Sequence, residues 1–299
     1  CAPRQSPRPS QRARSRFTAS RSAPVAVTGS ATSAAALSVA AGAVAVAYLF
    51  FRRSRMPSRA QLERTIAQLD AAIAALPEEV ASAEAPNTTI EVRIGTTDMA
   101  AADEELVGRI AELINSAYFA ALRELLPPHA TTYSRVDEDD VYHRLEMGDA
   151  GARANRVLHL AFRDDGVLVG ACSSTYQPPW CEEGCGHWGL VAVAPEAQGG
   201  GVASALVRAA ELRLAGACGE VQIEYEYTVG HAYSERLRQW YETKLGFGCA
   251  AGPPRGPEGS TQFRKCRKVL SEAACRVGRR RHLTELRRHF ESELAHLSE

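Results

Sequence analysis

Acidic residues are absent from the beginning of this sequence. Residues 1–62 contain ten arginines and no aspartate or glutamate, whereas residues 63–263 contain 30 acidic and 15 basic residues. Residues 264–299 are basic again, with ten basic and five acidic residues. The formal net charge of +0 therefore hides an uneven distribution. The acidic middle disfavours nucleic acid as a partner and favours cationic molecules, although a merely solvated acidic surface explains the same excess.

Cysteine is too sparse to build a disulfide scaffold. The chain has eight cysteines in 299 residues, and we expect ordinary thiols in a reducing compartment. Cys181, Cys185 and His187 are metal-ligand residue types, but no second pair follows them. We therefore predict no metal site here, and favour a loop beside the functional site with Trp180 and Trp188 as its walls.

The longest stretch without a charged residue includes residues 23–51 and lies in the leader, which comprises residues 1–57. Its first 22 residues are rich in Arg, Ser and Pro, which is typical of an organellar transit peptide. Residues 35–51 are long enough to span a membrane, but they are mostly alanine. A transmembrane helix, a cleaved targeting region and a disordered leader all stay open. We expect the protein in a plastid or mitochondrion or anchored to a membrane, or in the cytoplasm if translation starts at Met56.

Two amphipathic helices are predicted outside the central region. Residues 58–76 have a coiled-coil-like stripe and a capping-box pattern at Ser58 and Gln61, and residues 77–88 form a linker. Residues 271–299 form a C-terminal segment, with a helix over 279–298. The stripe of that helix consists of Leu283, Leu286, Phe290, Leu294 and Leu297. It can pack on the helix at 58–76 or join two subunits in a homodimer.

Residues 89–270 read as one α/β domain with a mixed sheet. Strands are expected at 89–94, 157–162, 167–173, 190–193 and 221–227, with closing strands near Phe247 and at 261–267. Helices are expected at 98–126, 137–148, 202–215 and 234–244. The turn at 164–166, Asp-Asp-Gly, predicts a hairpin.

The most informative stretch is a short strand that enters a glycine-rich turn and then a helix, residues 190–203 (LVAVAPEAQGGGVA). Such a turn directs backbone N–H groups toward one point, where the helix dipole adds positive potential. This arrangement suits a pyrophosphate. The dinucleotide-binding pattern is not met, because its last glycine would fall on Ser204, and the Lys of a phosphate-binding P-loop is absent.

Two motifs together resemble the GNAT family of N-acetyltransferases. Residues 198–203 (QGGGVA) resemble the family's Gln/Arg-x-x-Gly-x-Gly/Ala motif. Residues 240–247 (WYETKLGF) resemble its Tyr-Glu-Lys-Leu-Gly-Phe signature, with one inserted Thr. The resemblance covers residues 89–270 and implies the GNAT acyl-CoA N-acyltransferase fold, with acetyl-CoA as co-substrate.

The resemblance also implies roles for particular residues. The strand at 190–193 would bind the pantetheine arm through the backbone of Val191, Ala192 and Val193. Tyr241 would protonate the departing thiolate, and Ser234 stands where the family often has a cofactor-contacting Asn. The turn would hold the pyrophosphate through Gln198, Gly199, Gly200, Gly201, Val202, Ala203 and Ser204.

Three residues are candidates for the base that takes the amine's proton. His187 precedes the cofactor strand, where family members often place a Glu, and histidine titrates near neutral pH. Glu224 and Glu226 share one face of a predicted strand; we rank them slightly above His187, although that face can also simply meet solvent. The predicted function is acetyl transfer to an amine by direct attack. The alternative is a catalytically silent, membrane-tethered acyl-CoA-binding module.

Overall fold

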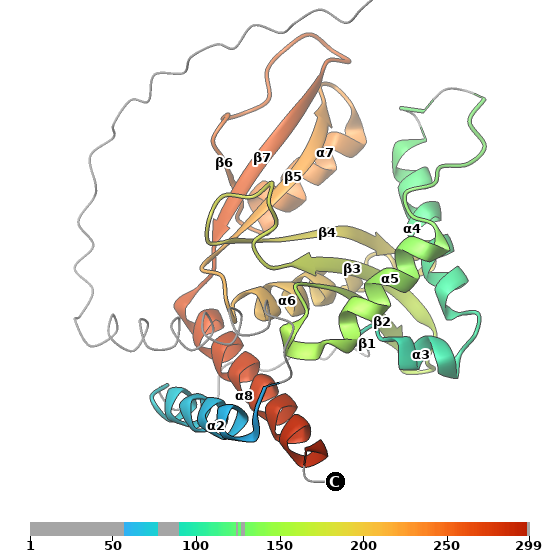
Figure 1. Cartoon of the computed structure of the whole chain (residues 1–299). Coiled ribbons are helices and arrows are strands. Elements are labelled where there is room, and N and C mark those ends of the chain that lie inside the picture. Colours follow the sequence, from blue (N-terminus) through green and yellow to red (C-terminus); the bar gives the residue numbers. More distant parts are fainter. Residues whose placement is uncertain (1–56, 77–89, 124, 127–128, 298–299) are drawn as a thin grey trace, which may run out of the picture.

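The computed structural model describes residues 57–76, 90–123, 125–126 and 129–297. Its centre is a seven-stranded sheet in the order β1-β2-β3-β4-β5-β7-β6 (Figure 1). Only the β4–β5 pair is parallel; the other neighbouring strands are antiparallel. The strands are β1 (Ile90–Ile94), β2 (Arg156–Arg163), β3 (Leu168–Thr175), β4 (Cys185–Val193), β5 (Glu220–Thr228), β6 (Gly248–Cys249) and β7 (Thr261–Val269).

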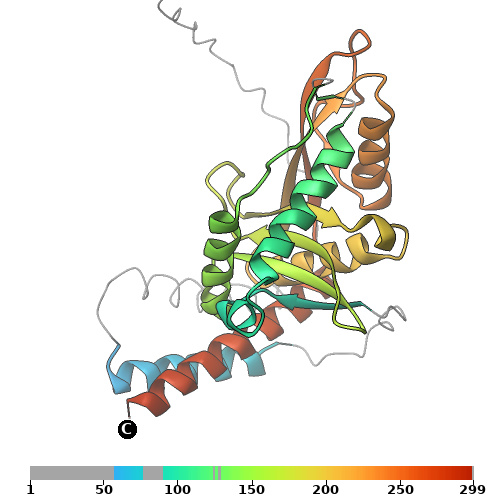
Figure 2. The same cartoon turned by 90° about the vertical axis from the view of Figure 1, so that its right-hand side faces the viewer.

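Helices cover both faces of the half of the sheet formed by β1 to β4 (Figures 1 and 2). On one face, α6 (Val202–Leu214) lies so close to β3 that a Cβ on Gly170 would be 2.7 Å from Val202 Cγ1. On the other face, α5 (Glu138–Asp149) approaches the chain just after β1, and a Cβ on Gly148 would lie 2.0 Å from the Gly95 carbonyl oxygen. These glycines are needed because any side chain would push the layers apart.

The predicted mixed α/β architecture is confirmed, with one correction among the helices. The expected helix at 98–126 is two helices, α3 (Thr97–Ala102) and α4 (Leu106–Leu122). Asp103 is extended, with φ −148°, and its carboxylate binds the Arg109 guanidinium. The ion pair joins the residue at the break to α4.

A second correction concerns β4, which begins at Cys185 and not at residue 190. Gly186, His187 and Gly189 interrupt the apolar pattern of this part of the strand, so the sequence did not predict it. Gly186 has to be small, because a Cβ there would lie 2.8 Å from Leu214 Cδ2 of α6. Close packing against the helix, and not β propensity, explains the composition of this segment.

The two flanking helices pack against each other. The helix α2 (Arg59–Ala74) begins as predicted, with the Ser58 N–H donating to Gln61 Oε1 at 2.8 Å. The helix α8 (Glu272–His296) begins earlier than expected, because the Ser271 hydroxyl accepts a hydrogen bond from the Ala274 N–H. Of the two alternatives for α8, the structure shows packing on α2. Their shared buried cluster comprises Leu62, Leu69, Ala72, Leu76, Leu283, Leu286 and Phe290.

The predictions for residues 1–56 and the linker at 77–88 lie outside the described residues, and these include the candidate membrane segment at 35–51. Across the part of the chain that the structure describes, no helix has the length and apolar character to cross a membrane.

Candidate active site

The sheet opens between β4 and β5. These parallel strands pair only at Cys185 with Glu220 and at Gly186 with Val221, and beyond that point they diverge (Figure 1). β4 stays paired with β3, but its register shifts opposite residues 171–173, where Leu190 takes a left-handed conformation with φ 52°. Among the residues that the structure describes, the edge of β4 that faces β5 therefore has no strand partner over residues 187–193. An extended ligand with amide groups can pair with such an edge.

The predicted pantetheine-binding residues lie on this open edge, and the glycine turn follows them directly. The turn has two left-handed glycines, Gly199 with φ 82° and Gly201 with φ 84°. Gly201 is the N-cap residue of α6, and no side chain caps the helix. The first N–H groups of α6 are thus left for a ligand. Val202 is 2% exposed, so its contribution to an anion site is its backbone N–H.

Tyr241 lies at the opening on the face of the sheet that α6 covers. It follows α7 (Ala232–Arg238), in a π-helical turn at Gln239–Lys244. The Thr inserted into the sequence motif explains this turn, because one extra residue widens a helix locally. The Tyr241 ring is 4.9 Å from the ring of Tyr225 and 5.9 Å from that of Trp188. Burial, reinforced by Tyr118 and other neighbouring groups, raises the Tyr241 pKa well above its usual value. The phenol therefore keeps its proton over the whole physiological range.

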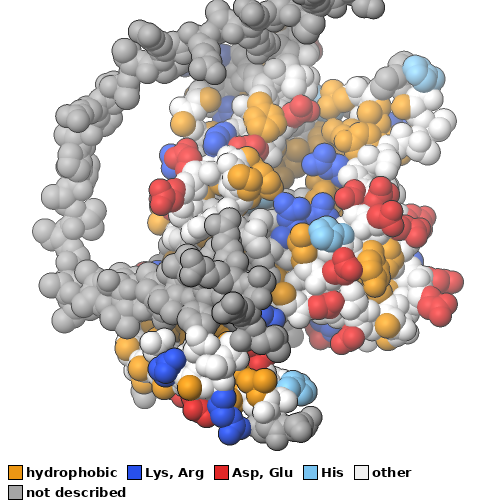
Figure 3. Space-filling model, in the orientation of Figure 1, with side chains coloured by type: hydrophobic (Ala, Val, Ile, Leu, Met, Phe, Trp, Pro, Cys, Tyr) orange, Lys and Arg blue, Asp and Glu red, His pale blue; other side chains and the backbone are white. Residues whose placement is uncertain are grey.

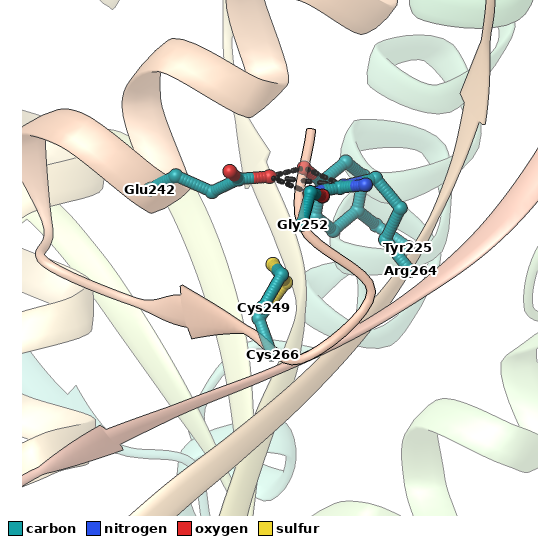
Figure 4. The surroundings of a disulfide bond; sticks show 6 residues. All are labelled: Tyr225, Glu242, Cys249, Gly252, Arg264 and Cys266. Atoms are coloured by element: carbon teal, nitrogen blue, oxygen red, sulfur yellow. Dashed lines mark hydrogen bonds and ion pairs between the residues drawn. A yellow bond between two sulfur atoms is a disulfide. The ribbon is translucent and has the colours of Figure 1, made fainter. Parts of the chain in front are cut away.

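A buried ion pair anchors the turn that carries Tyr241 (Figure 4). Arg264 of β7 is 1% exposed, and its Nη2 donates to Glu242 Oε1 at 2.7 Å. The Tyr225 hydroxyl donates to the same oxygen at 2.7 Å, and Arg264 also donates to the Gly252 carbonyl at 2.8 Å. Glu242 is the residue after Tyr241, so these bonds fix the position of the phenol relative to β5 and β7.

Two of the cysteines are not the free thiols that the sequence predicted. Cys249 and Cys266 form a disulfide, because the β6–β7 pairing places them opposite each other (Figure 4). Their sulfurs and a Glu242 carboxylate oxygen lie within 4.8 Å of one another, an arrangement that could hold a metal ion. Sulfurs bonded to each other cannot act as thiolate ligands. The disulfide lies beside the Arg264–Glu242 pair and ties β6 to the same strand.

His187 lies at the start of the divergence, on the opposite face. Gly186 faces α6 and Trp188 faces Tyr241, so the residue between them points the other way. His187 Nδ1 is 2.8 Å from the carbonyl oxygen of Gln222, to which it donates a hydrogen bond. The other nitrogen, Nε2, is then the basic one. Burial lowers the pKa of His187 from 6.5, so the neutral, proton-accepting form is favoured.

The two glutamates lie on the same face as His187, further along β5. Glu224 Oε1 accepts a hydrogen bond from Gln222 Nε2 at 3.2 Å and lies 3.8 Å from Lys265 Nζ. Glu226 is exposed. This face carries the polar side chains because a loop, and not a helix, covers its beginning: the Glu182 N–H donates to Gln222 Oε1 at 3.3 Å. Of the three candidates, His187 is the one that directly follows the last residue of β4 paired with β5, where the divergence begins.

Ser234 forms a hydrogen bond within the protein, next to its own helix. Its side chain is buried, and its hydroxyl accepts a hydrogen bond from the Thr228 N–H at 3.1 Å. The bond joins the first turn of α7 to the end of β5. The predicted cofactor contact through this hydroxyl would have to compete with it.

Sequence reasoning missed the groups that hold Tyr241 in place. Nothing in the sequence signals the Arg264–Glu242 pair, which joins residues far apart in the chain. Trp188 was expected only as a loop wall, yet its indole N–H is buried without a hydrogen-bond partner among the described residues. A donor of this kind beside the opening is available to a bound ligand.

Comparison with known proteins gives the family. Residues 99–247 match the model of the acetyltransferase (GNAT) family. No curated protein matches the chain. Similar solved structures include the ribosomal-protein-alanine N-acetyltransferase from Brucella melitensis, at 19% identity over 60% of this chain and 99% of that one, with a TM-score of 0.40. An acetyltransferase of the GNAT family from Streptococcus pneumoniae has 15% identity over 61% and 99%, with a TM-score of 0.40.

The spermidine N-acetyltransferase from Vibrio cholerae, in complex with CoA and spermine, has 12% identity over 62% of this chain and 98% of that one, with a TM-score of 0.40. The assignment rests on the family match, and not on these distant structures. Through its domain at residues 99–247, the chain belongs to the GNAT family of acetyltransferases.

Proposed function

We propose that this protein transfers the acetyl group of acetyl-CoA to an amine, with the reaction taking place where β4 and β5 diverge. The observation that carries the proposal is the pair of groups at this opening. The half-buried Tyr241 phenol lies on one face of the sheet, and the His187 imidazole, whose Nδ1 donates to the Gln222 carbonyl, lies on the other. In acetyl transfer by direct attack, a group of the first kind can protonate the leaving thiolate, and one of the second kind can take the proton of the amine, directly or through water.

The residues at the opening fit an acyl-CoA thioester. The unpaired edge of β4 offers backbone N–H and C=O groups to the amides of the pantetheine arm, through Val191, Ala192 and Val193. The uncapped N-terminus of α6 offers N–H groups to the pyrophosphate, and the left-handed Gly199 and Gly201 shape the turn there. The unpartnered Trp188 N–H is one more donor. Bound there, acetyl-CoA supplies an activated acyl group.

The chain's own groups then move the protons. His187 Nε2 takes a proton from the attacking amine, directly or through water, while Nδ1 stays bound to the Gln222 carbonyl. Tyr241 gives its hydroxyl proton to the leaving sulfur on the opposite face. Burial keeps its hydroxyl protonated at neutral pH, and the thiolate that is released when the C–S bond breaks is the base that takes this proton. The two faces therefore separate the acid from the base.

The proposal is tested by incubating the full chain with acetyl-CoA and a panel of amines, and following free CoA and acetylated product. Tyr241→Phe should lower kcat by about 10²- to 10⁴-fold. The acetyl-CoA affinity, measured by the rise in melting temperature with NAD as control, should stay nearly unchanged. Tyr142→Phe, an exposed tyrosine on α5, is the matched control.

Equal loss of turnover and of acetyl-CoA binding in Tyr241→Phe would contradict the acid role. Binding of acetyl-CoA without transfer to any amine would favour the silent acyl-CoA-binding alternative. No stabilisation by acetyl-CoA would contradict the proposal as a whole.

A further inference from the structure

Three arginines without carboxylate partners gather on the face of the sheet that carries His187. Arg156 is the first residue of β2, Arg144 lies on α5, and Arg135 precedes α5. No ion pair to any of them is found among the described residues. Most other arginines of the domain have one: Arg109 pairs with Asp103, and Arg163 with Asp165.

The surroundings of Arg144 disfavour its positive charge. Its side chain is half-buried, and its Nε is buried without a hydrogen-bond partner among the described residues. Burial lowers the pKa of Arg144, and the nearby positive charges of Arg156 and Arg135 lower it further. Asp140, one helical turn earlier, opposes this shift but forms no ion pair with Arg144 in the described structure. Uncompensated positive charge at a half-buried position is unusual unless a ligand neutralises it.

Arg156 is aligned with the candidate base. It is paired with Thr175 across β2 and β3, and Thr175 is paired with His187 across β3 and β4. The three residues lie in one row across neighbouring strands, which separates Arg156 from His187 by about 10 Å. Arg156 Nε donates to Thr175 Oγ1 at 3.2 Å, which orients the guanidinium along this row.

Trp180 lies between the guanidinium and the imidazole. Its ring is 5.9 Å from the ring of His187 and 5.8 Å from Cζ of Arg156. Glu224, the nearest carboxylate on β5, already interacts with Gln222 and Lys265. Figure 3 shows basic side chains gathered in the middle of this face. An apolar ring between a base and a group of cations forms a surface for an acceptor that carries its amine at one end and an anion at the other.

We propose that the acceptor is an amine with a carboxylate or phosphate about 10 Å away, which Arg156 binds with help from Arg144 and Arg135 while the amine reaches His187. This inference rests on the proposed function and names its substrate class. The span corresponds to about three residues of an extended peptide, at about 3.3 Å per residue, or to a long straight-chain amino acid. An α-amino carboxylate alone is too short. The acidic excess of residues 63–263 favoured cationic acceptors, but the charges at this face favour the opposite.

The test compares tetrapeptide amides that differ only by one glutamate, glutamine or lysine, placed in turn at the second, third and fourth positions. Straight-chain amino acids of increasing length form a second arm, which distinguishes a small molecule from a peptide. For the wild-type chain we expect kcat/KM to favour glutamate over glutamine by about 10- to 100-fold, mainly through KM. The preference should peak at the third or fourth position.

Arg156→Gln should reduce the glutamate-to-glutamine ratio to near one, and Arg156→Lys should retain part of it. Arg144→Gln should lower the ratio without lowering the melting temperature, because it removes an unpaired cation. Arg163→Gln, at the other end of β2 and paired with Asp165, is the matched control and should leave the ratio unchanged.

A ratio near one in the wild-type chain, or a ratio that survives both Arg156→Gln and Arg144→Gln, would overturn the inference. Failure of the proposed function looks different, because then no peptide or amine of either arm is acetylated at all.

Discussion

The two faces of the sheet differ sharply where β4 and β5 diverge. On the Tyr241 face the side chains are aromatic and fixed, with Tyr225, Trp188 and Trp240 around the phenol and a buried ion pair and a disulfide behind it. On the His187 face they are polar or charged, and Arg135, Arg144 and Arg156 form no ion pair among the described residues. This comparison suits a division of roles in which the Tyr241 face binds the same ligand, acetyl-CoA, in every reaction, and the His187 face binds acceptors that can differ.

A constant ligand permits a rigid site, because the same atoms have to be positioned in every reaction cycle. In this protein the rigid face is the proposed site of thiolate protonation. The face on which these arginines lack a carboxylate partner among the described residues is where an acceptor would supply the missing negative charge. Substitutions on the first face should therefore affect stability and every acceptor alike, whereas those on the second should change rate and selectivity with little effect on folding.

On the acceptor face, the largest effect is expected from His187→Gln, which removes the proposed base. We expect kcat/KM to fall by about 10²-fold or more for every acceptor, with acetyl-CoA affinity and melting temperature nearly unchanged. Steady-state kinetics at saturating acetyl-CoA measure this loss. A decrease of less than about threefold would mean that water alone relays the proton.

The pH profile tests the same residue without a mutation. An imidazole accepts protons only above its pKa, and burial lowers the pKa of His187 from 6.5. The acidic limb of kcat/KM should therefore lie below about pH 6.5, and His187→Gln should abolish it. An acidic limb of the enzyme that is unchanged in the variant would contradict the assignment.

The largest loss of stability is expected on the Tyr241 face. Arg264→Met leaves Glu242 as a largely buried carboxylate without its cation, which should cost about 3–5 kcal/mol of unfolding free energy. Denaturant unfolding measures this cost. Arg109→Met is the control, because its ion pair with Asp103 is 43% exposed on both sides, and its loss should cost less than about 1 kcal/mol. An equal loss of unfolding free energy in Arg264→Met and Arg109→Met would contradict the claim that the Tyr241 face is held by a buried ion pair.

The disulfide should contribute less than the ion pair. Its cysteines are 17 residues apart, and a loop of that length corresponds to about 3 kcal/mol in the chain-entropy account. Reduction by dithiothreitol should lower the stability by about that amount, and the Cys249→Ser, Cys266→Ser double variant should respond no further to the reductant. A wild-type chain that is indifferent to reduction would show that the bond does not support this face.

The smallest effect is expected from Glu226→Gln. This carboxylate is exposed and lies further along β5 than the opening, so kcat/KM should change less than about threefold, which is under about 1 kcal/mol of barrier. Glu224→Gln provides the comparison, because Glu224 lies nearer to His187 on the same face. A loss of a hundredfold in Glu226→Gln would move the role of base from His187 to Glu226.

Local motifs could be predicted from the sequence, and long-range partners could not. The turn from Gln198 to Ala203 and the signature around Tyr241 are contiguous, so their glycines, spacing and inserted Thr are visible in the sequence alone. The π-helical turn at Gln239–Lys244 was not predicted, because the sequence indicated one regular helix over residues 234–244. The break at Asp103 was missed, because the apolar periodicity continues across it.

The Arg264–Glu242 pair, the disulfide and the row from Arg156 to His187 depend on the register between strands. Cysteine spacing did not predict the pairing of Cys249 with Cys266, because a two-residue strand placed them opposite each other. Arg156 directly precedes the predicted strand at 157–162, and nothing in the sequence relates it to His187. Its position relative to His187 exists only once β2, β3 and β4 are aligned.

A crystal structure of the chain in complex with CoA would test the central claim most directly. The account predicts the pantetheine arm paired with the open edge of β4, the pyrophosphate at the N-terminus of α6, and the sulfur about 3–3.5 Å from the Tyr241 hydroxyl oxygen. CoA bound away from the divergence of β4 and β5, or a sulfur directed away from Tyr241, would contradict it.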